Sequence, residues 1–190
     1  PTYDKAHLNV TNKHTPEKIN VNGSKTWVDG NDQDGKRPTS ITINLLADGT
    51  KVDSKTVTEV DDWKWAFTNL PKYSAGTEIV YTVSEETVAN YSTTYDGMNV
   101  TNSYTPGKTS VSGTKTWDDN ENQDGKRPTS ITINLLADGT KVDSKTVTAA
   151  DDWSWSFTDL AEYKNKTKIV YTITEDEVTG YTTEVNGYNV

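Results

Sequence analysis

The chain has 190 residues, a formal net charge of −9 and no cysteine. This acidic balance argues against nucleic acid and against an anionic membrane surface as partners, because both are bound through basic patches. The lack of cysteine excludes disulfide bonds and cysteine-ligated metals, and no apolar run approaches the roughly 18 residues of a membrane span. No signal peptide opens the chain either, so we expect an excised part of a longer protein.

The dominant feature of the sequence is an internal repeat with a period of 90 residues. Segment 33–58 is identical, letter for letter, to segment 123–148. Such a repeat predicts two similar domains, and a unit of about 90 residues is large enough to bury a core of its own. We predict a terminal strand of a preceding repeat with its linker over 1–15, a first domain over 16–105, and a second domain over 106–190 whose last strand is incomplete.

From the amino terminus onward, the pattern is one of short strands separated by turns. The strand segments alternate apolar with polar residues, are rich in Thr, Val, Ile and aromatic residues, and are bounded by turn residues such as Asp48-Gly49. About seven such strands in each repeat predict an all-β fold of two tandem immunoglobulin-like β-sandwiches with Greek-key connections. In the first repeat the predicted strands include residues 19–27, 40–46, 55–58, 63–67 and 79–83, and a last strand ends at 102.

Strand alternation also predicts where three polar residues of the first repeat point. Lys25, Glu85 and Asn102 each fall on the same face as the apolar residues of their own strand, so we expect all three to face the interior. Glu86 falls on the opposite face and should point to solvent. A lysine, a glutamic acid and an asparagine that meet inside a protein can form an amide bond. An ordinary ion pair at a sandwich edge, with Asn102 as a turn residue, fits the same pattern.

Several longer motifs, taken together, resemble the B-type repeats of Cna-like collagen adhesins from Gram-positive cell surfaces. They are the runs VSGTKTWDD at 111–119, DGKRP at 34–38 and 124–128, YTVSE at 81–85 and NVTNSYTP at 99–106. The resemblance covers nearly the whole chain. It implies an inverse immunoglobulin-like fold and a role as an extracellular stalk or spacer in an adhesin that is anchored to the cell wall. It also implies a spontaneous isopeptide bond from a lysine of the first strand to an asparagine of the last, promoted by an acidic residue.

Carried over position by position, the resemblance assigns roles to individual residues. The residues are Lys25, Glu85 and Asn102 in the first repeat, and Lys115 and Glu175 in the second. The asparagine of the second repeat would fall at position 192, whereas the sequence ends at Val190. The resemblance implies no cofactor, no metal and no enzymatic turnover, since the product of the reaction is the protein itself.

The chemistry of this bond has a physical basis in burial. Burial among apolar side chains lowers the pKa of a lysine, which leaves a neutral amine as the nucleophile. The same burial favours a protonated glutamic acid, which can polarise the asparagine carbonyl and pass a proton to the departing ammonia. The folded sandwich supplies proximity, which is worth effective molarities of roughly 10⁵–10⁸ M.

The amino-terminal segment carries a partial copy of the last strand, in which Leu8, Val10 and Asn12 share a face. An unpaired strand and an incomplete sheet edge tend to associate. We therefore expect head-to-tail self-association, in which the amino-terminal strand of one chain completes the second repeat of the next and Lys115 is crosslinked to Asn12. The alternative is that Lys115 bonds an asparagine that follows Val190. Neighbouring repeats of the same protein are the other expected partners.

Other functions remain open. A module that binds a host protein of unknown identity is the first competitor of the stalk. A glycosidase needs paired carboxylates, but neighbours such as Asp61–Asp62 face opposite ways on a strand, so a turn is the better interpretation. The acidic loops 29–34 and 118–124 faintly suggest calcium, yet neither has glycine at the sixth position of an EF-hand loop, which favours solvated turns. His7 and His14 have no metal-ligand spacing.

Overall fold

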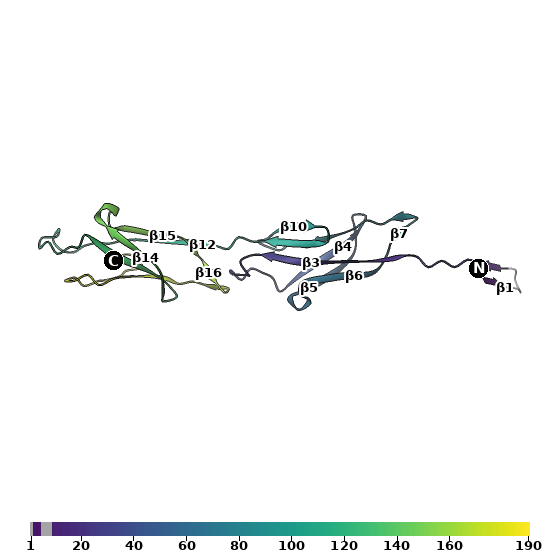
Figure 1. Ribbon diagram of the computed structural model, residues 1–190, viewed down its shortest axis with the longest axis horizontal. Coiled ribbons are helices and arrows are strands. Elements are labelled where there is room, and N and C mark those ends of the chain that lie inside the picture. Colours follow the sequence, from purple (N-terminus) through teal and green to yellow (C-terminus); the bar gives the residue numbers. More distant parts are fainter. Residues whose placement is uncertain (1, 5–8) are drawn as a thin grey trace. The chain divides into compact units, whose positions relative to one another are not determined.

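The computed structural model describes residues 2–4 and 9–190, with side chains from residue 10 onward (Figure 1). The described residues form strands joined by turns, with two short 3₁₀ helices. The chain divides into two compact units, the first ending at Tyr104 and the second beginning at Thr105, except that Asp32–Lys36 group with the second unit. Each unit is an immunoglobulin-like β-sandwich, so the predicted all-β fold of two tandem domains is confirmed.

The first unit packs a four-stranded sheet against a three-stranded sheet. The larger sheet has the order β10 (Ser92–Asp96), β11 (Asn99–Ser103), β3 (Lys18–Val28), β6 (Lys64–Pro71); the smaller has the order β5 (Thr50–Thr58), β4 (Ser40–Ala47), β9 (Tyr81–Glu85). A small hairpin of β7 (Tyr73–Ser74) and β8 (Thr77–Glu78) lies between β6 and β9 in the chain, and η1 (Glu59–Asp61) lies between β5 and β6.

The second unit repeats this arrangement as far as its sequence runs. Its strands are β12 (Lys108–Thr114) paired with β15 (Ser154–Ala161), a three-stranded sheet of β14 (Thr140–Thr148), β13 (Ser130–Ala137) and β18 (Tyr171–Glu175), and a hairpin of β16 (Tyr163–Lys164) and β17 (Thr167–Lys168). Helix η2 (Ala149–Asp151) takes the place of η1. The pairings of β13 with β14 and β18 follow the register of β4 with β5 and β9, displaced by the 90-residue period.

Local sequence explains the turns that connect these strands. The β4–β5 hairpin turns at Asp48 and Gly49, whose φ angles of 48° and 81° are those of a two-residue turn that matches the twist of paired strands. After β5, the Asp61 carboxylate accepts hydrogen bonds from the backbone and hydroxyl of Thr58, and Asp62 ends η1 in the left-handed conformation. Asp61 and Asp62 therefore form the turn before Trp63, as the sequence predicts.

The core of the first unit lies between its two sheets. Alternation within the strands supplies it, since residues two apart on a strand share a face. The buried apolar side chains are Val21, Ile41, Ile43, Leu45, Val57, Trp65, Phe67, Tyr81, Val83 and Val100. The second unit has the matching cluster of Val111, Ile131, Ile133, Leu135, Val147, Trp155, Phe157 and Ile173. Each repeat thus buries a core of its own, as its length predicts.

The first and last strands of the first repeat, β3 and β11, lie side by side and run parallel, with Lys25 opposite Val100 and Asn102 opposite Trp27. Gly23 allows the chain to come this close, because a Cβ at that position would collide with the backbone oxygen of Met98, just before β11. Gly113 meets Tyr188 in the same way in the second repeat. The glycine therefore controls how closely the two ends of the repeat approach.

The amino-terminal residues form a separate hairpin of β1 (Thr2–Asp4) and β2 (Asn9–Thr11). It pairs Thr2 with Thr11 and Asp4 with Asn9, the register in which β10 and β11 pair Thr94 with Thr101 and Asp96 with Asn99. A copy of the terminal hairpin of a repeat would have this register, and the assignment to a preceding repeat stays a prediction. His7 and Leu8, named in the sequence analysis, lie outside the described residues.

Gly23→Ala should weaken the first repeat, because the added methyl group forces β3 away from Met98 and overpacking of this kind costs about 1–3 kcal/mol. Urea unfolding followed by tryptophan fluorescence should show a lower midpoint than in the wild-type chain. Thr26→Ala, at an exposed position of the same strand, is the control and should keep the wild-type midpoint. An unchanged midpoint in Gly23→Ala would show that the close approach carries no constraint.

Candidate functional site

Lys25 and Glu85 meet in the interior of the first repeat. Lys25 comes from β3 in the larger sheet and Glu85 from the end of β9 in the smaller sheet, so the two side chains reach each other across the sandwich. The Lys25 Nζ lies 2.5 Å from the Glu85 Oε1, and both side chains are fully buried. The neighbouring Glu86 is 61% exposed, in agreement with strand alternation. An ionisable pair without solvent contact is rare in a protein core and needs a reason.

Asn102 lies on the strand next to Lys25, two residues beyond the residue that faces it in the parallel ladder. Residues spaced in this way share a face of the sheet, within reach of a long side chain. Asn102 has no exposed surface, and neither its Oδ1 nor its Nδ2 has a hydrogen-bond partner among the described residues. A buried carboxamide without partners costs free energy, so an interaction that uses these atoms is expected.

The protonation of Lys25 is determined by competing effects. Burial lowers the pKa of Lys25 below its ordinary value of 10.5, and the hydrogen bond and negative charge of Glu85 only partly oppose this effect. Desolvation penalises the charged ammonium more than the carboxylate stabilises it. The neutral amine, which is the nucleophilic form, is therefore more accessible to Lys25 than to an exposed lysine.

Aromatic rings cover the lysine. The Lys25 Nζ lies 4.7 Å from the centre of the Trp27 ring, and Trp63 and Tyr91 each pack edge-on against that ring with centroids 5.1 Å away. The Lys25 backbone N–H also donates to the Trp63 carbonyl oxygen at 2.8 Å. These rings contribute to the burial that lowers the pKa of Lys25.

A buried carboxylate holds this aromatic cover in place. Asp29 is only 2% exposed. Its carboxylate accepts hydrogen bonds from Arg37 Nε at 3.0 Å, Arg37 Nη2 at 2.7 Å and the Tyr91 hydroxyl at 2.9 Å. The Arg37 guanidinium also lies 5.4 Å from the centre of the Trp27 ring. We name Asp29, Arg37 and Tyr91 the latch. A bidentate arginine–carboxylate pair is rigid, so the latch fixes both Tyr91 and Trp27.

Strand alternation and motif spacing do not distinguish the latch, although the repeat carries a signal for it. Each member recurs 90 residues later, as Asp119, Arg127 and Tyr181, with the same hydrogen bonds. The expectation of a solvated acidic turn is wrong for the loop 29–34, in which Asp29, Asp32 and Asp34 are all buried. Arg37 and Tyr91 compensate the burial of the Asp29 charge. Within the part of the chain that the structure describes, no group of three or more His, Cys, Asp or Glu residues is arranged to hold a metal ion.

The Glu85 carboxylate has a second partner that sequence analysis also missed. The Thr93 hydroxyl donates to Glu85 Oε2 at 3.2 Å, while Oε1 faces Lys25. Thr93 lies on β10 and pairs directly with Asn102 on β11. Its recurrence as Thr183 at the repeat period was again the available signal.

The second repeat brings together the corresponding residues Lys115 and Glu175. The Lys115 Nζ lies 3.0 Å from Glu175 Oε1 and donates a hydrogen bond to Glu175 Oε2 at 3.1 Å, with side chains 6% and 0% exposed. It also lies 4.7 Å from the centre of the Trp117 ring. Val190 occupies the position of Val100, since its N–H donates to Thr114 and its carbonyl oxygen accepts from Thr116. The site therefore has its lysine, its acid and the start of its last strand.

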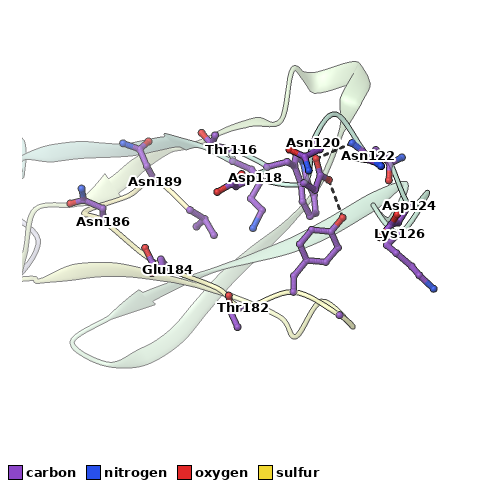
Figure 2. Close-up of a pocket in the computed structure, with 17 residues that line it drawn as sticks. Thr116, Asp118, Asn120, Asn122, Asp124, Lys126, Thr182, Glu184, Asn186 and Asn189 are labelled. Carbon is purple, nitrogen blue, oxygen red and sulfur yellow. Dashed lines mark hydrogen bonds between the residues drawn. The ribbon is translucent and has the colours of Figure 1, made fainter.

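An open groove of about 820 Å³ lies beside this pair in the second repeat. Both Lys115 and Val190 line this groove. Figure 2 shows it between the segment that carries Thr116 and the segment that carries Thr182 and Glu184. The lining is mainly polar. In contrast to the buried Asn102, Asn12 is exposed in the extended segment between β2 and β3, and the expected crosslink to Lys115 stays a prediction.

None of the described residues belongs to a helix that is long and apolar enough to cross a membrane. His14 lies in the extended segment before β3, and Asp61 and Asp62 form a turn rather than a pair of catalytic carboxylates in a cleft. Among the candidates from the sequence, the lysine and glutamic acid pairs are thus the residues that the fold brings together in its interior.

Comparison with known proteins finds one matching family model, described as the Cna protein B-type domain, over residues 21–103 and 111–190. A collagen adhesin from Staphylococcus aureus is 47% identical over 189 residues, which are 95% of this chain but only 16% of that protein. The chain is also 44% identical to a solved single B repeat unit of the collagen-binding surface protein of Staphylococcus aureus, covering 90% of this chain and 92% of that one, with a TM-score of 0.47. A solved pair of such units is 44% identical, covering 93% and 49%, with a TM-score of 0.49.

The latch of the second repeat should make that repeat sensitive to acid. Hydrogen bonds from Arg127, followed by those from the Asn122 backbone and Tyr181, hold the pKa of Asp119 well below its ordinary value of 3.8. A carboxyl group whose pKa is lowered by folding stabilises the fold fully above the unfolded pKa, and this contribution is lost as the pH falls toward the folded pKa. We therefore expect the unfolding temperature in calorimetry to fall between about pH 5 and pH 2 by less in Asp119→Asn than in the wild type.

Asp118→Asn, at the exposed neighbouring position, serves as the control for this measurement and should keep the pH dependence of the wild type. Equal slopes in wild type and Asp119→Asn would show that the latch does not contribute to the acid response.

Proposed function

The chain belongs to the family of Cna protein B-type domains, and on that premise we propose that its first repeat joins Lys25 to Asn102 through an amide bond promoted by Glu85. The observation that carries this proposal is the fully buried Asn102 carboxamide, without a hydrogen-bond partner among the described residues, on the strand beside a fully buried lysine and glutamic acid pair. The lowered pKa of Lys25 supports it further, because the reaction requires a neutral amine.

The proposed reaction balances without a co-reactant. Lys25 Nζ attacks Asn102 Cγ, a Cγ–Nζ bond forms, and the Cγ–Nδ2 bond breaks. The amine gives up one proton, which Glu85 receives and passes to the departing Nδ2, and the leaving group is ammonia. Glu85 ends the reaction in its starting state, so the one carboxyl group acts as both base and acid. The carboxyl lies 2.5 Å from the amine, which is within the reach that such a proton transfer needs.

A permanent ion pair between Lys25 and Glu85 is the competing interpretation. Such a pair gains little stability, because desolvation of both charges offsets most of their attraction. It also leaves the two polar atoms of the Asn102 side chain unexplained. Bond formation accounts for both observations, since it removes the lysine charge and converts the isolated carboxamide into part of a secondary amide.

The position of the bond suggests a mechanical role. Lys25 lies on the first strand of the repeat and Asn102 on the last, so a force applied to the two ends would pass through the amide and bypass the residues between them. By the chain-entropy model for crosslinks, closing a loop of this size stabilises a domain by on the order of 4–5 kcal/mol. We propose that the repeats are spacers in the stalk of an extracellular adhesin of a bacterial cell surface.

The name of the Staphylococcus aureus relative supports this setting. It is a collagen adhesin, of which the chain spans 16%. Collagen binding belongs to that whole protein, and for these two repeats we propose the supporting role. The second repeat is proposed to use Lys115 and Glu175 in the same chemistry, on the basis of the same buried pair.

Intact mass spectrometry tests the bond. The wild-type chain should have lost the mass of one ammonia from its first repeat, and Lys25→Ala, Glu85→Ala and Asn102→Ala should each retain the full sequence mass. Lys115→Ala is the matched control and should leave the loss in the first repeat unchanged. Because a succinimide at Asn22-Gly23 would also release ammonia, peptide mapping must show Lys25 and Asn102 in one branched peptide. A full-mass wild-type chain would refute the proposal.

Single-molecule pulling tests the stalk role. Chains held by their two ends should show an unfolding event of the first repeat in Asn102→Ala and none in the wild type, because the bond leaves residues 26–101 outside the path of the force. Asn99→Ala, which changes an exposed asparagine of the same strand, should behave like the wild type. Equal extension of the first repeat in wild type and Asn102→Ala would contradict a bond that carries the applied force.

A further inference from the structure

We propose that Thr93 is a positioning residue of the bond-forming site, whose hydroxyl group orients the Glu85 carboxyl between Lys25 and Asn102. This inference rests on the proposed function and adds a fourth residue to it. Thr93 acts on the amine of Lys25 through Glu85, to which both residues donate a hydrogen bond.

The first support is the division of the Glu85 carboxylate between two partners. Oε1 accepts from Lys25 Nζ at 2.5 Å, and Oε2 accepts from the Thr93 hydroxyl at 3.2 Å. With one hydrogen bond to each oxygen, the carboxyl group cannot rotate without breaking one of them. The oxygen that faces the amine is thereby specified.

The second support is the place of Thr93 in the sheet. Thr93 and Asn102 are directly opposite in the β10–β11 ladder, so their side chains project to the same face. The residue that holds the acid is thus the cross-strand neighbour of the residue that would be attacked. Tyr95, two positions further along β10, accepts the Glu85 backbone N–H at 3.0 Å. Strand β10 therefore holds both the backbone and the side chain of Glu85.

The third support is that the contact recurs in the second repeat in a different backbone setting. The Thr183 hydroxyl donates to Glu175 Oε2 at 2.8 Å, although residues 181–185 of that repeat form no strand. The threonine and the glutamic acid therefore keep their hydrogen bond without the sheet ladder that surrounds Thr93. A residue chosen only for its strand propensity would not explain this contact. In this repeat Lys115 Nζ donates to the same Oε2 at 3.1 Å, so the division of the two oxygens between two partners is a feature of the first repeat.

The role follows from the proton transfers in the proposed reaction. One carboxyl oxygen must receive a proton from the lysine and later deliver it to the nitrogen of the departing ammonia. General acid and base catalysis depends on geometry, and a carboxyl group that rotates freely would spend part of its time with neither oxygen in line. The hydrogen bond from Thr93 removes that freedom before the reaction begins.

The test follows bond formation in freshly made protein. The full chain is produced in a short pulse of cell-free translation, translation is stopped, and the loss of ammonia is followed over time by intact mass. Thr93→Val keeps the shape of the side chain and removes the donor, and we expect it to slow the reaction roughly tenfold or more. Thr93→Ser keeps the donor and should restore a rate close to that of the wild type.

Two controls separate positioning from packing. Thr94→Val changes the adjacent, exposed residue of β10, and Thr183→Val makes the same substitution in the second repeat; both should leave the first-repeat rate unchanged. Thermal unfolding of Thr93→Val and Thr93→Ser in an Asn102→Ala chain, where the bond cannot form, measures their effect on stability alone. If Thr93→Val prevents folding of the Asn102→Ala chain, Thr93→Ser and Thr93→Ala are compared instead. In chains that retain Asn102, the serine variant should then lose ammonia faster than the alanine variant.

The possible results are distinguishable. A wild-type chain that never loses ammonia refutes the proposed function itself. If the wild-type chain and Thr93→Val lose ammonia at the same rate, the proposed bond stands and only the role of Thr93 is overturned. A serine variant as slow as the valine variant also overturns it, because the hydroxyl group would then not be the feature that matters. Slow reaction in Thr93→Val with recovery in Thr93→Ser supports the assignment.

Discussion

The burial of an amine and a carboxylic acid side by side is the constraint on which the rest of each repeat depends. Removing Lys25 and Glu85 from water has a large desolvation cost, and contacts with the surrounding structure offset part of that cost. The two sheets supply one partner each, the Trp27 ring covers the amine, and the latch of Asp29, Arg37 and Tyr91 holds that cover. The same devices recur in the second repeat. Maintaining such a costly arrangement twice in one chain argues that the pair has a task beyond cohesion.

Much of the fold follows from the sequence because its strands alternate regularly and its turns carry specific residues. The inward direction of Lys25 and Glu85 is a consequence of strand period alone, and Asp48-Gly49 specifies its hairpin. Thr93 and the latch are different. They depend on contacts between strands and loops distant in the sequence, and threonine, aspartate and arginine in a polar stretch look the same whether solvated or buried. Only their recurrence at the period of the repeat distinguished them beforehand.

The two repeats are also informative about each other. Strands β13, β14 and β18 copy the register of β4, β5 and β9, and in the second repeat Asn189 and Val190 take the places of Asn99 and Val100 at the start of β11. In the first repeat, Asn102 on β11 lies beside the strand that carries Lys25, whose amine already contacts Glu85. Groups held together in this way by a fold have a high effective concentration for any reaction between them.

The parallel pairing of β3 with β11 has a further consequence for a repeat that has not yet reacted. Because the two terminal strands run in the same direction, the chain enters at one end of the repeat and leaves at the other. Tension then slides the strands along each other and loads their ladder of hydrogen bonds together, whereas an antiparallel terminal pair would open one bond at a time like a zipper. A folded repeat is thus arranged to resist shear between its terminal strands even without a covalent bond between them.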